Sequence, residues 1–415
     1  MAADASEPEL PLLAAPTAGV PPVATTEAQL QETIDSLAAG TGPLAIDTER
    51  AHGFRYSTRA YLIQLRRAGS GTHLVDPIGF WNGDEPADLS ALGAVVDDVP
   101  WIIHAATQDM PCLAEVALVP QQVFDTELAG RLLGWPRVGL GPMIEKVFGK
   151  RLAKEHSASD WSSRPLPESW LTYAALDVEL LIELREHMVA ELIAADRAEW
   201  ARQEFAHLAA HAADPTPPRP DPWRRTSGIQ NVRTPLGMAV LRQIWEARDE
   251  LARSLDKAPS KLLKDSAISD LAALVGQHKR VDRGMLRDIS GFERRVARRY
   301  ESRWLTAAEK ALAAPRSSHP PLRPPSSGIP NPKSWARRAP QADERRVRMR
   351  TVMDELSERF GVAPEVILSP GTWRELAWEP CDATPAAVTD WLTEHGARPW
   401  QCDLTAEPLA RAISG

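Results

Sequence analysis

Cysteine is scarce in this chain of 415 residues: Cys112, Cys381 and Cys402 are scattered and form no Cys-x-x-Cys pair. This usage provides no disulfide framework and suits a reducing compartment, so we predict a cytoplasmic protein. Long apolar runs are also missing, since no stretch reaches the roughly 18 apolar residues of a membrane-spanning helix. The acidic start MAADASEPEL lacks the basic region of a secretory signal. We therefore expect no membrane partner.

Several motifs of nucleotide and acyl chemistry are absent as well. The chain has no G-x-x-x-x-G-K-[ST] phosphate loop and no G-x-S-x-G nucleophile turn. The pair Gly139-Leu-Gly141 is too short for a dinucleotide fingerprint. These absences exclude the most readily recognised classes of nucleotide-binding enzyme and serine hydrolase.

Charge is present but unevenly distributed. Residues 216–350 hold 29 Lys and Arg against 14 Asp and Glu, whereas the rest of the chain holds 19 against 42. A solvated surface explains any single run of charge. A bias over so long a segment favours a polyanionic partner such as nucleic acid.

Apolar periodicity predicts a mixed α/β domain followed by helical domains. Short apolar runs predict strands at 43–49, 61–66, 72–76, 101–104 and 123–125. Proline-rich stretches separate helical segments that contain no predicted strand. The resulting organisation is a disordered tail at 1–27, an α/β domain at 28–208, a linker at 209–222, a helical domain at 223–312, a Pro-rich linker at 313–334 and a second helical domain at 335–415.

Four acidic residues in the α/β domain carry the chemistry. Asp47 and Glu49 are two apart on a predicted strand, so their side chains leave the same face. Asp109 stands at a helix start, and Asp177 follows Tyr173 by one helical turn. Each has a common structural explanation, such as chance at a strand end or helix capping. Together they form an oxygen-only ligand set suited to Mg²⁺ or Mn²⁺, and two such ions can support phosphodiester cleavage.

The order of these motifs resembles the DEDD exonuclease superfamily, and Tyr173 marks its DEDDy subgroup. The motifs AIDTE, HAATQD and YAALD, with VFDTELAGRLLG and KEHSASDWSSRPL between them, are similar to ribonuclease D. Residues 223–312, with WRRTSG and ISGFERR, resemble an HRDC domain. Residues 335–415 resemble the second, more divergent helical domain of these enzymes.

This resemblance implies a ribonuclease H-like fold and a 3′→5′ exonuclease that releases nucleoside 5′-monophosphates. Asp47 would bridge two divalent ions, Mg²⁺ or Mn²⁺, with Glu49 and Asp177 on the ion that activates water. Asp109 would support the second ion, and Tyr173 would hold the attacking water. The implied substrate is the 3′ end of structured RNA such as tRNA precursors, and no obligate protein partner is evident.

Other residues are candidates for contact with the substrate: Thr48, Arg50, His104 and Arg164. Arg50 departs from the aromatic residue that many relatives have after the Glu. His104 has the alternative of a hydrogen-bonded core histidine, and Arg164 that of neutralising nearby acids. Asp125 is predicted to cap a helix. In the helical domains the basic candidates for phosphate contact are Lys261, Lys264, Arg294, Arg295, Arg298, Arg299, Arg345, Arg346, Arg348 and Arg350.

Two alternative functions stay open on the sequence. A DNA-directed 3′→5′ exonuclease in repair would use the same acids. A catalytically silent adaptor would use only the nucleic-acid-binding surfaces. The sequence alone does not distinguish RNA from DNA.

Overall fold

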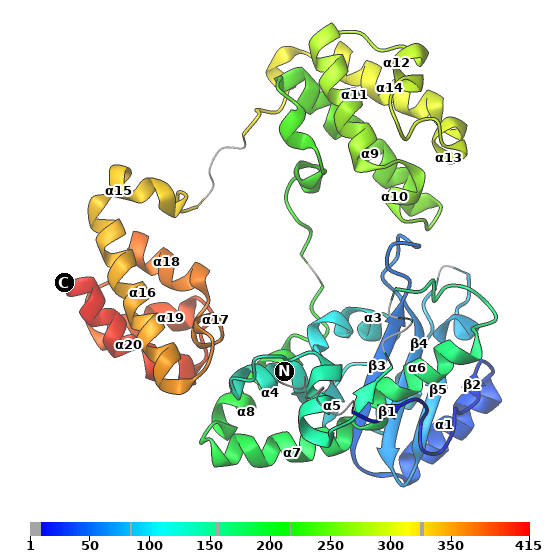
Figure 1. Cartoon of the computed structure of the whole chain (residues 1–415), viewed down its shortest axis with the longest axis vertical. Helices are drawn as coiled ribbons and strands as arrows, with labels where there is room; N and C mark the ends of the chain where they lie inside the picture. The colour runs from blue at the N-terminus through cyan, green and yellow to red at the C-terminus, as the bar shows by residue number, and fades with distance from the viewer. Residues whose placement is uncertain (1–9, 84, 154–155, 157, 216, 324–327) are drawn as a thin grey trace, which may run out of the picture.

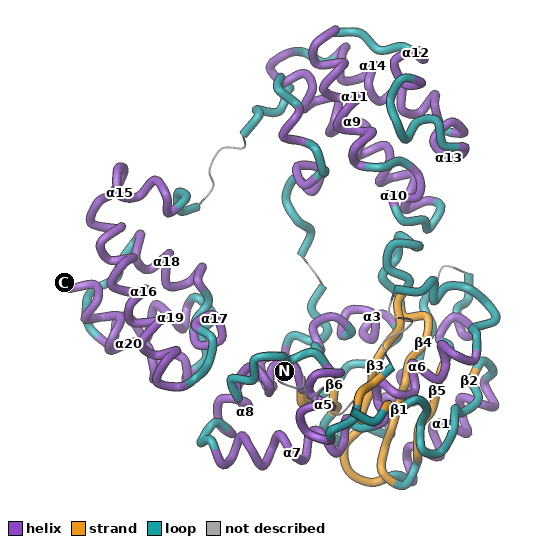
Figure 2. Tube along the Cα trace, in the orientation of Figure 1, coloured by secondary structure: helices purple, strands orange, loops and turns teal. Residues whose placement is uncertain are grey.

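A computed structural model describes residues 10–83, 85–153, 156, 158–215, 217–323 and 328–415. Figure 1 shows a sheet covered by helices, followed along the chain by two separate helical bundles that extended segments connect. The same division is visible in the secondary-structure colouring of Figure 2, where the strands are confined to the first part of the chain. The fold is therefore an α/β domain with a mixed sheet followed by helical domains, as apolar periodicity predicts.

The main sheet has six strands in the order β2-β5-β4-β3-β6-β7. Its strands are β2 (Val23–Ala24), β3 (Thr41–Arg50), β4 (Ala60–Ala68), β5 (Gly71–Val75), β6 (Trp101–Ile103) and β7 (Val123–Asp125). β3, β4 and β5 form an antiparallel meander, whereas β6 pairs with β3 and β7 pairs with β6 in parallel. The five predicted strands correspond to β3 through β7.

Both faces of β3 are buried at its centre, where Leu44, Ala45 and Ile46 form a short apolar run. Leu44 and Ile46 pack in the core cluster that includes α1 (Glu27–Ala39) and α3 (Met110–Glu115). Ala45 points to the opposite face, in the cluster that includes α7 (Leu181–Ala194). Asp47 and Glu49 continue this second face, and the β3–β4 register shifts between Glu49 and Arg50.

Helices cover the sheet and terminate where local signals predict. α1 begins after Thr26, whose hydroxyl accepts a hydrogen bond from the Gln29 amide, and it ends before Gly40. The remaining helices of this domain are α2 (Ser90–Ala94), α4 (Thr126–Leu132), α5 (Leu140–Phe148), α6 (Glu168–Glu179) and α8 (Ala198–Ala210). The chain after Pro167 forms the three successive helices α6, α7 and α8, because turns interrupt the helical run after Glu179 and Ala194.

The prediction of a disordered tail at 1–27 is wrong for residues 10–27, and residues 1–9 lie outside the described part of the chain. β1 (Leu12–Leu13) pairs with β8 (Arg151–Leu152), and β2 pairs with the edge strand β5. The backbone amide of Thr17 donates to the buried Glu179 carboxylate at 2.9 Å. These contacts supply the ordering energy that a segment rich in Ala and Pro cannot supply by itself.

Two all-helical domains follow. The first has its own buried core and comprises α9 (Pro235–Ser254), α10 (Pro259–Leu262), α11 (Asp265–His278), α12 (Arg283–Arg287), α13 (Arg295–Arg299) and α14 (Glu301–Ala313). The second comprises α15 (Trp335–Arg338), α16 (Pro340–Phe360), α17 (Pro364–Ile367), α18 (Pro370–Trp378), α19 (Pro385–Glu394) and α20 (Pro399–Ser414) around a separate core. No helix in the described ranges has both the length and the apolar character needed to cross a bilayer.

Candidate active site

A pocket of about 550 Å³ opens where β3 meets α6 and the start of α3. The five residues that the sequence singles out for catalysis all line it: Asp47, Glu49, Asp109, Tyr173 and Asp177. Positions separated by up to 130 residues in the chain are therefore brought to one place by the fold.

Three of the carboxylates form a compact group. Asp47 and Glu49 project from one face of β3, and Asp177 comes from α6, which contacts β3, β4 and β5. One oxygen of each of these three carboxylates lies within 4.8 Å of the others. Such a set of hard oxygen donors matches the ligands that Mg²⁺ and Mn²⁺ prefer.

Electrostatics indicate that this group needs a cation. Burial, followed by repulsion from Asp47 and Asp177, raises the pKa of Glu49 to about 10. Burial also raises the pKa of Asp177 to about 7 and that of Asp47 well above its ordinary value. Carboxylates perturbed in this direction are destabilised as anions, and a divalent cation between them removes that penalty. The residues present therefore fit a metal site.

Tyr173 reaches the same group from α6. It lies one helical turn before Asp177, and both side chains line the pocket. Burial, with the neighbouring negative charge of Asp177, raises the pKa of Tyr173 well above its ordinary value. The phenol consequently stays protonated and available as a hydrogen-bond donor.

Asp109 lies in the pocket but outside the group of three. Its Oδ1 accepts a hydrogen bond from the Thr48 hydroxyl at 2.5 Å and lies 3.7 Å from Nη2 of Arg50. Burial raises the pKa of Asp109 to about 6, while Thr48 and Arg50 act in the opposite direction. The expected convergence of four carboxylates is thus present for three of them, and Asp109 has protein partners of its own.

Asp125 holds the turn that presents Asp109. Its carboxylate accepts hydrogen bonds from the amides of Ala105, Ala106 and Leu128 at 2.9–3.1 Å. The predicted helix cap is therefore confirmed, because the Leu128 amide belongs to the first turn of α4. The two other bonds fix the left-handed Ala105 and the short turn Ala106–Gln108 that leads into Asp109. Sequence reasoning missed this second role, which depends on the pairing of β6 with β7.

The predicted substrate contacts divide into two sets. Thr48, Arg50 and His104 line the pocket, whereas Arg164 does not. Nδ1 of His104 lies 2.9 Å from the Thr126 hydroxyl, and burial lowers the pKa of His104 to about 4. His52 also lines the pocket, just beyond Arg50 in the chain, and was not predicted.

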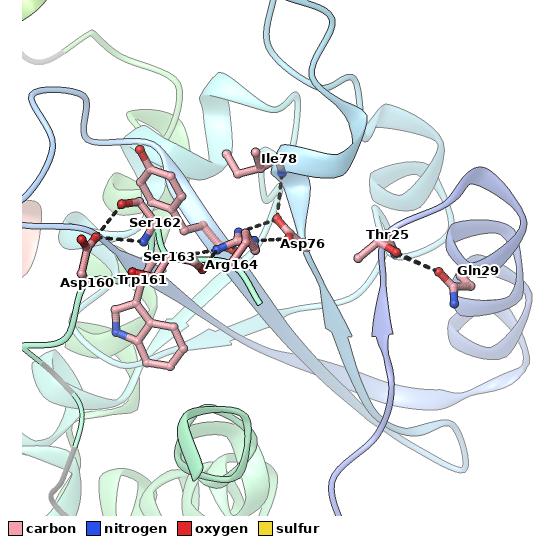
Figure 3. A network of polar contacts seen from close by, with 10 residues as sticks. Thr25, Gln29, Asp76, Ile78, Asp160, Trp161, Ser162, Ser163 and Arg164 are labelled. Carbon is pink, nitrogen blue, oxygen red and sulfur yellow. Dashed lines mark hydrogen bonds and ion pairs between the residues drawn. The ribbon is translucent and has the colours of Figure 1, made fainter. Parts of the chain in front are cut away.

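Arg164 has a structural role instead, which Figure 3 displays. Its guanidinium makes two bonds to the Asp76 carboxylate, at 2.6 and 2.7 Å, and donates to the carbonyls of Tyr61 and Trp161. These contacts favour the second of the two sequence-based interpretations, with Asp76 as the acid that is neutralised. They fix the segment that precedes α6 to the end of β5.

The same segment anchors α6 through aromatic contacts. Trp161 is fully buried, and its ring lies 5.2 Å from that of Trp170 and 6.5 Å from that of Tyr173. Through these contacts Trp161 anchors α6 against the sheet. In the KEHSASDWSSRPL motif, Lys154, Glu155 and Ser157 lie outside the described residues.

Some of the basic candidates in the helical domains have internal partners. Arg345 and Arg348 donate to the carbonyls of Ala377 and Ala412, and Arg346 pairs with Asp343. These three side chains therefore stabilise the second helical domain itself. Nζ of Lys261 lies 4.5 Å above the ring of Phe54, which follows β3.

Comparison with protein families gives three matches along the chain. Residues 21–193 match a 3′-5′ exonuclease family, residues 238–307 match the HRDC domain, and residues 328–413 match the C-terminal domain of a 3′ to 5′ exonuclease. The ribonuclease D of Gluconacetobacter diazotrophicus is 30% identical over 346 residues, which cover 81% of each chain.

Solved structures agree with this likeness over nearly the whole chain. A protein from Bifidobacterium adolescentis is 37% identical, with a TM-score of 0.87, and the match covers 98% of this chain and 100% of that one. Escherichia coli RNase D, an exoribonuclease involved in structured RNA processing, shares the fold at 23% identity, with a TM-score of 0.65. That match covers 95% of this chain and 98% of the Escherichia coli chain.

Proposed function

The chain belongs to the ribonuclease D family and is a 3′→5′ exoribonuclease, and on that premise we propose how its pocket works. The substrate is the 3′ end of structured RNA such as a tRNA precursor, from which single nucleotides are released as 5′-monophosphates. The cofactors are two divalent cations, Mg²⁺ or Mn²⁺, and their ligands are Asp47, Glu49, Asp109 and Asp177. No finding favours a repair exonuclease acting on DNA or a silent adaptor.

One observation supports this proposal above all others. The carboxylates of Asp47, Glu49 and Asp177 converge within 4.8 Å beside the hydroxyl of Tyr173. Three acids that repel one another, with Glu49 buried and Asp47 and Asp177 half-buried, are costly to the fold unless a bound cation compensates them. Their joint presence with a protonated phenol favours hydrolysis of a phosphodiester over a purely structural role.

The residues of the chain divide the work of this reaction. Bound divalent ions supply the positive charge that lowers the pKa of a water and stabilises the leaving 3′ oxygen. Tyr173, kept protonated by its surroundings, orients the attacking water through its phenolic oxygen. The Thr48 hydroxyl holds Asp109 in place, and Arg50 lies beside the same carboxylate. His104, neutral near pH 7, lies where the terminal nucleotide enters.

We also propose that the first helical domain guides RNA toward the pocket. The loop that follows β3 contacts this domain: the Ala258 amide donates to the Phe54 carbonyl at 3.0 Å, and the Tyr56 hydroxyl donates to Asp249 at 3.0 Å. The loop begins at Ala51, directly after Arg50. A domain with excess positive charge thus adjoins the strand that carries Asp47 and Glu49, as a path for a polyanion requires.

The division of the chain stays part of this proposal. An exonuclease domain at 28–208, an HRDC domain at 223–312 and a second HRDC-like domain at 335–415 are consistent with the three family matches. The flanking segments at 209–222 and 313–334 would act as linkers. The ordered strands β1 and β2 extend the first domain toward residue 10.

The decisive experiment follows single-nucleotide release from a 3′-labelled RNA by the full-length protein. Release should require Mg²⁺ or Mn²⁺, stop with EDTA and be abolished by Asp177→Asn. Asp88→Asn, which alters an exposed carboxylate that does not line the pocket, serves as the matched control. Release that persists in EDTA, or in Asp177→Asn, would show that the carboxylate group is not the catalytic site.

A second measurement addresses the substrate. Two RNA strands of the same sequence, one of which ends in a 2′-deoxynucleotide, should be cleaved at different rates if the pocket contacts the terminal 2′-hydroxyl. Equal rates on both strands would indicate that the pocket does not recognise the terminal 2′-hydroxyl and that the helical domains select the RNA.

A further inference from the structure

Arg50 stands between the group of three carboxylates and Asp109. Its Nη2 lies 3.7 Å from Oδ1 of Asp109, and its Nη1 donates to the carbonyl of Gln108. The side chain of Asp109 is only 5% exposed, while that of Arg50 is 17% exposed. A permanently charged guanidinium therefore neutralises a buried carboxylate at the edge of the pocket.

This arrangement bears on how cations enter the pocket. A guanidinium at this distance repels a second cation placed on the same carboxylate, and the repulsion is stronger in a partly buried site than in water. Among the described residues the ion pair of Arg50 is with Asp109, and its charge acts on Asp47 and Glu49 only as a minor influence from further away. The group of three is thus ready for a divalent ion, whereas Asp109 already has a positive partner.

A phosphate provides Arg50 with an alternative partner. Arginine binds phosphate through two parallel N–H donors, and such charge-assisted bonds are among the strongest available. Arg50 lines the pocket that would receive the terminal nucleotide, so its guanidinium can meet a phosphate without leaving the site. Rotation of the side chain from Asp109 to a phosphate would expose the carboxylate to a second cation.

We propose that Arg50 is an exchangeable counterion of Asp109, so that the protein without substrate binds one divalent cation strongly and accepts the second only when a phosphate attracts Arg50. This inference rests on the proposed two-cation function. If Arg50 exchanges in this way, a bound phosphate raises the affinity for the second cation, and the second cation raises the affinity for phosphate by the same factor. Both ligands favour the position in which the guanidinium is turned away from Asp109. This exchange also gives a function to the residue that replaces the aromatic side chain found after the Glu in many relatives.

The test counts bound Mn²⁺ by equilibrium dialysis and titration calorimetry on the full-length protein, with and without adenosine 5′-monophosphate. This nucleotide supplies a phosphate and is not hydrolysed by an exonuclease. The unchanged protein should bind one Mn²⁺ alone and two in its presence. Arg50→Gln should bind two in both conditions, with the second ion held about tenfold more tightly than in the unchanged protein.

Three further variants test whether the effect is specific to the charge of Arg50 and to the carboxylate of Asp109. Arg55→Gln removes the same charge from a residue whose guanidinium donates to the Ser162 hydroxyl at 2.7 Å, and it should leave the second ion dependent on the nucleotide. Arg50→Lys keeps a positive charge and should also retain that dependence. Arg50→Gln combined with Asp109→Asn should return the count to one, since the ligand itself is lost.

Two results would overturn the inference: two equally tight ions in the unchanged protein without nucleotide, or an unchanged second-ion affinity in Arg50→Gln. Thermal denaturation of each variant verifies that it is folded before ions are counted. The results that would contradict the proposed two-cation function itself are distinct from these two. In that case the unchanged protein would bind no Mn²⁺, or Asp177→Asn would bind Mn²⁺ as well as the unchanged protein does.

Discussion

Tyr173 and Asp177 lie one turn apart on α6 and line the same pocket. The phenol therefore belongs beside the group of three carboxylates, and burial together with the negative charge of Asp177 raises its pKa and keeps it protonated. Because both residues are on one helix, their separation is set by helix geometry and does not depend on a flexible loop.

Tyr173→Phe removes the hydroxyl and leaves the ring in place, so we expect slower turnover with RNA affinity nearly unchanged. Loss of a group that orients the attacking water should lower kcat by about a hundredfold. Single-turnover kinetics and RNA titration separate the two quantities. Tyr300→Phe, in the first helical domain, removes the same atom and should leave both unchanged. A large loss of affinity with normal kcat would contradict the water-orienting role.

Asp125→Asn should impair the pocket without touching it. The carboxylate holds the amides of Ala105, Ala106 and Leu128, and an amide side chain cannot accept all three bonds equally well. An unsatisfied buried amide costs about 1–3 kcal/mol, so unfolding in urea should begin at lower concentration. Asp88→Asn makes the same change at an exposed carboxylate that accepts a hydrogen bond from the Ser90 amide. This variant should lose much less unfolding free energy than Asp125→Asn. Equal losses in the two variants would argue against the positioning role.

Part of this site was predictable from local geometry. The alternation of a strand places Asp47 and Glu49 on one face, and the helical repeat places Tyr173 and Asp177 on one face. The diversion of Asp109 toward Arg50 was not predictable in this way. It depends on how the turn at Ala105 is oriented by Asp125, and that contact spans two parallel strands.

The ordered N-terminal segment was missed for a related reason. Its composition is low in β-branched and aromatic residues, so residues 10–24 carry no strong strand signal by themselves. The order comes from partners far along the chain: Arg151 and Leu152 in β8, Leu74 and Val75 in β5, and the buried Glu179. Arg164 likewise has two equally reasonable sequence interpretations, and only the position of Asp76 decides between them.

His104 should make the protein sensitive to acid. Burial lowers its pKa to about 4 from an ordinary 6.5, so the unfolded chain binds a proton at pH values where the folded protein does not. Its stabilising contribution is complete above pH 6.5 and is lost as the pH falls toward 4. His104→Asn should therefore lose less unfolding free energy between pH 7 and pH 5 than the unchanged protein. His278→Asn replaces an exposed histidine of α11 and should lose as much unfolding free energy between pH 7 and pH 5 as the unchanged protein does. If His104→Asn also lost the same amount, the prediction would be refuted.

Glu204 should control how the second helical domain docks on the exonuclease domain. One of its carboxylate oxygens accepts from Nε of Arg398 at 2.7 Å and from Nε1 of Trp400 at 2.8 Å. The ring of Trp400 also stacks on Trp200 of α8, with centroids 4.6 Å apart. Glu204→Ala leaves the half-buried Arg398 guanidinium and the buried indole N–H of Trp400 without this acceptor, and the unsatisfied indole alone costs about 1–3 kcal/mol.

The expected result is partial detachment of the second helical domain, seen as a larger radius of gyration in small-angle X-ray scattering. Binding of folded RNA should weaken, whereas release of nucleotides from short single strands should continue, because the carboxylate pocket lies in the other domain. Glu199→Ala provides the control on the same helix, since Glu199 and its partner Arg202 are both exposed and their pair contributes little. If Glu204→Ala left the radius and the affinity for folded RNA at the values of Glu199→Ala, the docking contact would have no part in recognising the substrate.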